Sequence, residues 1–70
     1  MDLPKLIYMA NQIAGFFEAQ GEAVAVAGAE DHLRRFWDPR MRREIVAHLA
    51  AGGEGLAPVA RAAVERLAAG

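Results

Sequence analysis

Proline and glycine residues divide this chain into four stretches, and this division limits it to short helices joined by tight turns. The clearest break is Asp38-Pro39, because the residue before a proline avoids helical angles and aspartate caps a helix that begins with proline. Gly21 and Gly52-Gly53 mark two further breaks. Within each stretch the apolar residues recur at helical spacing, and none alternates apolar and polar residues as a strand would. The sequence predicts an all-α fold, a small bundle of three to four short helices.

Four helices are expected: Leu3 to about Gln20, Glu22 to Phe36 or Trp37, Pro39 to about Ala51, and about Leu56 to Ala69. Gly28 lies inside the second, where it should cost about 1 kcal/mol relative to alanine. A close helix crossing would explain this glycine, and a coil over residues 21–28 is the alternative. The residues expected to face inward are Leu3, Leu6, Ile7, Ala10, Ile13, Ala14, Phe17, Val26, Ala29, Leu33, Phe36, Trp37, Met41, Ile45, Val46, Leu49, Leu56, Val59, Ala60, Ala63, Val64 and Leu67.

The length of 70 residues predicts one domain, residues 1–70, with a modest core. Although 54% of the residues are hydrophobic, many are alanines, which bury little area. A domain of this size is marginally stable, and without cysteine it has no disulfide to help it. Met9 and Phe16 widen the apolar stripe of the first helix to about half its circumference. We therefore expect that the chain binds a partner, or forms a homo-oligomer when isolated.

The overall charge excludes a general attraction to nucleic acid or to an anionic membrane, because the net charge is −1. The longest uncharged run, Leu6 to Phe17, is shorter than the roughly 20 residues that span a bilayer. The first residues also lack the basic region of a signal peptide. We expect a cytoplasmic protein that does not associate with membranes.

Groups that could carry chemistry are sparse. The chain has no cysteine, serine or threonine, which removes most nucleophilic side chains. Glu30 and Asp31 are adjacent and therefore point in different directions on a helix. His32 and His48 lie on different predicted helices, and neither has a second ligand at metal spacing. No catalytic, cofactor-binding or metal-binding residue is predicted, and both histidines are interpreted as structural.

The most concentrated feature is an arginine corner at residues 34–43, which holds five of the eight basic residues of the chain. One interpretation of this corner is a solvated charged face. In it, Glu30 pairs with Arg34, Asp31 with Arg35 and Arg40 with Glu44, each at i,i+4 spacing. Arginine and tryptophan are, however, enriched at binding hot spots, and Trp37 fits either the core or a surface anchor. Nucleic-acid binding is a further alternative, against which the acidic balance elsewhere counts. The candidate partner-binding residues are Arg34, Arg35, Trp37, Arg40, Arg42 and Arg43.

Two segments resemble a known family. LIYMANQIAGFFEA (residues 6–19) and DHLRRFWDPRMRREI (residues 31–45) are similar to the delta subunit of soluble, NAD-dependent, molybdenum-containing formate dehydrogenases. The second segment is the more specific because its composition is unusual. The resemblance covers residues 3 to about 50, and residues 20–30 match less closely.

The resemblance implies a small accessory subunit without cofactors of its own. The other subunits of such enzymes carry a molybdenum–pterin guanine dinucleotide, iron–sulfur clusters and FMN, and the enzyme passes electrons from formate to NAD. By this resemblance the chain is expected to bind the large catalytic subunit and to aid its assembly, stability or cofactor retention. The alternative is a small helical module that binds nucleic acid or itself through the arginine corner.

Overall fold

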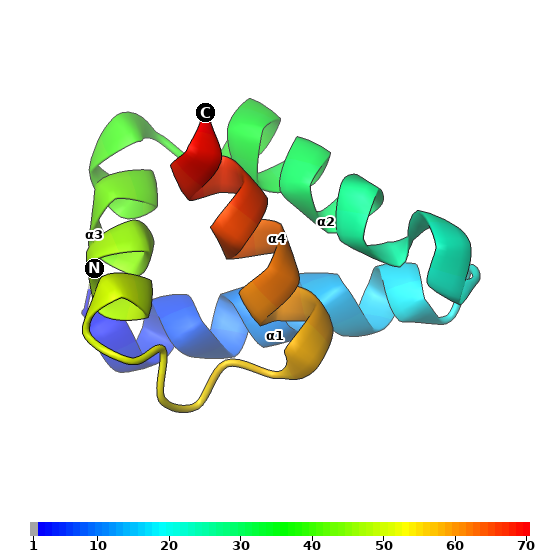
Figure 1. Cartoon of the computed structure of the whole chain (residues 1–70), viewed down its shortest axis with the longest axis horizontal. Coiled ribbons are helices and arrows are strands. Elements are labelled where there is room, and N and C mark those ends of the chain that lie inside the picture. Colours follow the sequence, from blue (N-terminus) through cyan, green and yellow to red (C-terminus); the bar gives the residue numbers. More distant parts are fainter. Residues whose placement is uncertain (1) are drawn as a thin grey trace.

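The computed structural model describes residues 2–70, and these residues form four helices and no strand (Figure 1). The helices are α1 (Leu3–Glu18), α2 (Glu22–Phe36), α3 (Pro39–Ala50) and α4 (Pro58–Ala69). Helices α1 and α4 each contact the other three. In Figure 1, α4 crosses the centre of the molecule between α2 and α3, above α1. The predicted all-α bundle is confirmed.

Two aspartates begin helices as the sequence predicts. An Oδ1 atom of Asp2 accepts a hydrogen bond from the amide of Lys5 (3.0 Å), and Asp38 Oδ1 accepts one from the amide of Met41 (2.9 Å). Each bond satisfies a donor in the first turn that has no partner within the helix. Helix α1 ends at Glu18, two residues earlier than predicted, and Gly21 then turns the chain at a φ of +128°.

The start of α4 differs from the prediction by two residues. Leu56 was expected to open the helix, but Ala57 has extended angles (φ −67°, ψ 158°), so α4 begins at Pro58. The cause is the proline, whose ring disfavours helical angles in the residue before it. Leu56 is nevertheless buried and contributes to the core from the loop.

Three side chains hold the loop between α3 and α4. Asn11 on α1 donates to the Gly55 carbonyl (2.8 Å) and accepts from the Ala57 amide (2.9 Å). Arg61 Nη2 donates to the Gly52 carbonyl (2.7 Å), and His48 Nε2 lies 2.7 Å from the Glu54 carbonyl oxygen. These bonds give the loop carbonyls partners and fix α4 against α1 and α3. The structural interpretation of His48 agrees with this position.

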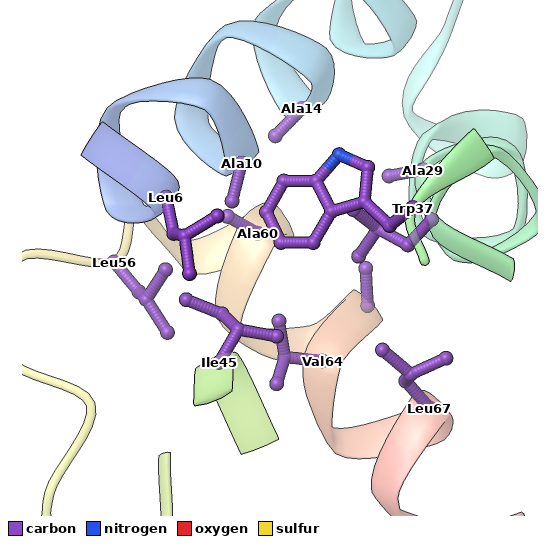
Figure 2. Packing of buried hydrophobic residues seen from close by; sticks show 12 residues of the cluster. Leu6, Ala10, Ala14, Ala29, Trp37, Ile45, Leu56, Ala60, Val64 and Leu67 are labelled. Atoms are coloured by element: carbon purple, nitrogen blue, oxygen red, sulfur yellow. The ribbon is translucent and has the colours of Figure 1, made fainter. Parts of the chain in front are cut away.

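The core combines alanines and aliphatic side chains with one buried tryptophan. Six of its thirteen buried hydrophobic residues are alanines, and Trp37 among them is only 4% exposed. Figure 2 shows the indole between Ala10, Ala14, Ala29 and Ala60. Alanines let the helix backbones approach closely, and the indole fills the space that their short side chains leave. The buried residues are Leu6, Ala10, Ala14, Ala25, Ala29, Leu33, Trp37, Ile45, Leu56, Ala60, Ala63, Val64 and Leu67.

The inward face of α2 is rotated relative to the prediction. Ala25, Ala29 and Leu33 form the buried stripe, and Trp37 continues it at the same i,i+4 spacing. Phe36, expected in the core, is 71% exposed because it lies one residue, or about 100°, away from that stripe. Two other residues expected in the core are also more exposed than predicted, although less so than Phe36. Val26 on α2 is half-buried, and Leu3 on α1 is 37% exposed.

Gly28 marks the close crossing that the sequence suggested. A Cβ atom built there would lie 2.8 Å from Cε1 and 2.9 Å from Cγ of Phe17 on α1. Carbon atoms do not approach that closely, so the ring of Phe17 occupies the place of a side chain on α2. The coil alternative for residues 21–28 is wrong, because α2 is helical from Glu22 onward.

Replacing Gly28 by alanine should destabilise the protein despite the better helix propensity of alanine. Displacing the Phe17 ring costs about 1–3 kcal/mol, which exceeds the gain of about 1 kcal/mol in propensity. Gly15→Ala is the matched control, because no atom lies within 4 Å of a Cβ there. Thermal unfolding should show a lower midpoint for Gly28→Ala and a higher one for Gly15→Ala. A rise for both would contradict the close crossing.

Candidate functional site

The arginine corner (residues 34–43) lies where α2 ends and α3 begins. Trp37 and Asp38 are both extended and join the two helices without a longer loop. Arginines therefore project from the last turn of one helix and the first turn of the next. These side chains have different surroundings: some arginines bond within the chain, and others are exposed and can bind another molecule.

Arg34 ties α2 to the last turn of α4. Its Nε atom lies 3.0 Å from Glu30 Oε2, and its Nη2 atom donates to the Arg66 carbonyl (3.2 Å). Glu30 also lies 3.8 Å from Arg66 Nη1 and is only 22% exposed. The predicted Glu30–Arg34 pair is thus present, and it has an additional contact between helices that the sequence did not reveal.

Arg35 forms the predicted pair with Asp31 (3.0 Å), but the two side chains are 70% and 60% exposed. Such an exposed pair contributes little stability. The third predicted pair, Arg40 with Glu44, is absent from the ion pairs of residues 2–70. Both pairs that form have the acid before the base in the chain, which is the more favourable order on a helix.

Arg42 has an internal role. Its Nη1 atom donates to the Arg34 carbonyl (3.2 Å) and to the Trp37 carbonyl, so that a side chain of α3 caps the end of α2. The last carbonyls of a helix have no partner within it, and a cation at that end also suits the helix dipole. Arg42 was predicted to bind a partner, which stays a prediction; within the chain its side chain holds the corner together.

The remaining three candidates differ in accessibility. Trp37 is in the core, which decides between the two positions that the sequence left open. Arg40 and Arg43 are exposed, and neither guanidinium has a hydrogen bond or ion pair with residues 2–70. These two arginines are free to bind carboxylates or phosphates of another molecule.

A groove of about 580 Å³ opens beside the corner, between α3 and the end of α4. Arginines from both sides of the turn line one part of it, and apolar side chains line the rest. The sequence did not indicate the groove, because it depends on how α4 lies against α3. Its lining residues are Arg34, Pro39, Arg42, Arg43, Val46, Ala47, Ala50, Leu67 and Ala68.

An aromatic surface of Phe16, Phe17, His32 and Phe36 lies between α1 and α2. The ring centroids are 5.1 Å apart for Phe16 and Phe17, 6.3 Å for Phe17 and His32, and 4.7 Å for His32 and Phe36. Phe16 is 62% exposed and Phe36 is 71% exposed. His32 thus packs among rings, in agreement with its structural interpretation. Exposed aromatic side chains grouped in this way are typical of surfaces that contact other molecules.

Residues 2–70 show neither a cluster of metal ligands nor a helix that could span a membrane. No three histidine, aspartate or glutamate side chains come together as ligands for a metal ion. None of the four helices is long and apolar enough to cross a membrane. The features that stand out are therefore the arginine corner with its groove and the aromatic surface.

A protein-family model matches most of the chain. The family model described as NADH-dependent formate dehydrogenase delta subunit FdsD matches residues 5–64. The chain belongs to this family. The match extends the resemblance seen in the sequence through residues 20–30 and into α4. No curated protein and no solved structure matches the chain.

In this delta-subunit chain, Arg42→Ala should lower stability and Arg43→Ala should not. Loss of charged hydrogen bonds to the end of α2 should cost about 1–3 kcal/mol. Arg43 is the matched control, because it lies next in the chain and has no internal partner. Urea unfolding should show a lower midpoint for Arg42→Ala alone. Equal midpoints for both variants would contradict the capping role.

Proposed function

We propose that this chain is a non-catalytic accessory subunit of a soluble, cytoplasmic, NAD-dependent formate dehydrogenase. It would bind the large catalytic subunit and aid its assembly, stability or cofactor retention. The family match over residues 5–64 is the observation that carries this proposal. The molybdenum–pterin dinucleotide, the iron–sulfur clusters and FMN would then belong to partner subunits.

Arg40 and Arg43 support docking through the arginine corner. Both are exposed cations that no side chain of residues 2–70 pairs with, and they lie on a turn that a buried tryptophan and two helix caps hold in place. Arginine presents a planar fork of donors that suits carboxylates, so the matching surface of the catalytic subunit would be acidic. The rigid turn would reduce the ordering cost of binding.

The nucleic-acid alternative has less support. Glu30 and Asp31 already neutralise Arg34 and Arg35, and Arg42 is directed at backbone carbonyls. Phosphate binding needs a surface with a clear excess of positive charge, whereas the whole chain has a net charge of −1. Tight, steeply salt-dependent binding to DNA or RNA would favour this alternative over a protein partner.

Reversing the charge of the free arginines should abolish binding without unfolding the chain. Arg40→Glu/Arg43→Glu should no longer co-purify with a tagged catalytic subunit at moderate salt, while circular dichroism stays helical. Lys5→Glu is a charge-reversal control at an exposed site remote in sequence from the corner. Arg42 is left unchanged because it holds the fold. Full co-purification of the folded double variant would show that docking occurs elsewhere.

Preparing the enzyme with and without the chain distinguishes the three roles of assembly, stability and cofactor retention. We expect lower formate oxidation per catalytic subunit when the chain is absent. A lower yield of complex would indicate assembly, faster inactivation would indicate stability, and a lower molybdenum content would indicate cofactor retention. The isolated chain should oxidise no formate. Identical enzyme in both preparations would contradict an accessory role.

The isolated chain should self-associate through its aromatic surface, because Phe16 and Phe36 are exposed to water. Sedimentation should show association that increases with concentration, and Phe16→Gln should weaken it. Tyr8→Gln is the control, an exposed aromatic residue of α1 that lies outside the surface. A monomer at all concentrations for the unsubstituted chain would contradict this expectation.

A further inference from the structure

The groove between α3 and α4 has two chemically distinct parts. Arg42 and Arg43 lie in the first turn of α3, at one end, whereas Ala50 lies in its last turn. Between them the floor is apolar, and no aspartate or glutamate of residues 2–70 lines it. An occupant that matches both parts has an apolar side along its length and negative charge at one end.

The floor carries small, exposed residues that leave room for a helix. Ala47 and Ala50 on α3 and Ala68 on α4 are exposed, and their short side chains allow another backbone to approach. Helices pack into grooves between helices at axis separations of about 8–10 Å, and small contact residues favour the shorter separations. An amphipathic helix laid in an apolar groove is a common mode of recognition.

The charges at the rim indicate which polar groups the occupant carries. Arg43 has no hydrogen bond or ion pair among residues 2–70, and Arg42 keeps its charge because its bonds go to neutral carbonyls. Arg34 forms an ion pair with Glu30 at 3.0 Å, which compensates its charge. Two uncompensated cations beside an apolar floor are complementary to carboxylates close to apolar side chains.

We propose, on the basis of the proposed function above, that this groove binds an amphipathic helix of the catalytic subunit with carboxylates clustered at one end. The apolar side of that helix packs on Val46, Ala47, Ala50 and Leu67 of the groove. Its carboxylates pair with Arg43, and the charge of Arg42, which stays bonded to the carbonyls at the end of α2, adds to the positive potential there. Docking is then an extension of the bundle by a fifth helix, supplied by the partner.

Photo-crosslinking in the assembled enzyme tests the position and the chemistry of this occupant. Benzoylphenylalanine replaces Ala47 or Ala50 in the groove, or Ala23 as a control, which is exposed on α2 and does not line the groove. After irradiation of the purified complex, mass spectrometry should join both groove positions to one helical segment that carries at least two carboxylates. Ala23 should give no crosslink to that segment. Crosslinks only from Ala23, or to a segment without carboxylates, would overturn the proposal.

A negatively charged side chain in the groove should weaken binding to the catalytic subunit. Ala47→Glu places a carboxylate four residues after Arg43, where it competes for that guanidinium, and Ala50→Glu places one on the apolar floor. Each should raise the dissociation constant at least about tenfold, whereas Ala23→Glu in the first turn of α2 should change it less than about twofold. Unchanged affinity for both groove variants would overturn the groove. Failure of the unsubstituted chain to bind the catalytic subunit would instead refute the proposed function.

Discussion

Arg42 reaches from the first turn of α3 back to the carbonyls at the end of α2, and Trp37, one of the two residues between those helices, is buried in the core. The capping bond, the Asp38 cap and the indole all hold this turn in place. If this turn opened, α2 would lose its cap and the core would lose its largest side chain. The angle between α2 and α3, and with it the position of every arginine in the corner, depends on this arrangement.

The distribution of large side chains explains why such a small bundle would need a partner. Alanine contacts let four short helices pack closely, but they remove little apolar area from water. The phenylalanines could have supplied more, yet Phe16 and Phe36 remain on the surface and Phe17 is only half-buried over Gly28. The stability that these rings do not provide within the chain is available when another molecule covers them.

Features set by local rules could be predicted from the sequence. The caps at Asp2 and Asp38 and the breaks at Gly21 and Gly52-Gly53 each follow from backbone preferences of one or two residues. At Gly28 the sequence left a close crossing and a coil open, and the packing of Phe17 decides for the crossing. The family also followed, because the corner segment is unusual in composition.

Features set by packing could not be predicted. Phe36 and Trp37 are neighbours with similar hydrophobicity, and only the rotation of α2 against α1 and α4 decides which ring is buried. The capping role of Arg42 likewise depends on the turn that brings α3 beside the end of α2. The groove is formed by two helices that a loop separates, so no single segment of the sequence predicts it.

On the proposal above, the surface formed by α3 and the end of α4 faces the catalytic subunit, whereas Arg42 and Trp37 stabilise the fold. Hydrogen–deuterium exchange of backbone amides, compared between the isolated chain and the assembled enzyme, tests it most directly. We expect slower exchange in the complex over residues 39–50 and in the last turn of α4, with little change over residues 22–28. Slower exchange confined to α1 or to residues 22–28, with α3 unchanged, would contradict it.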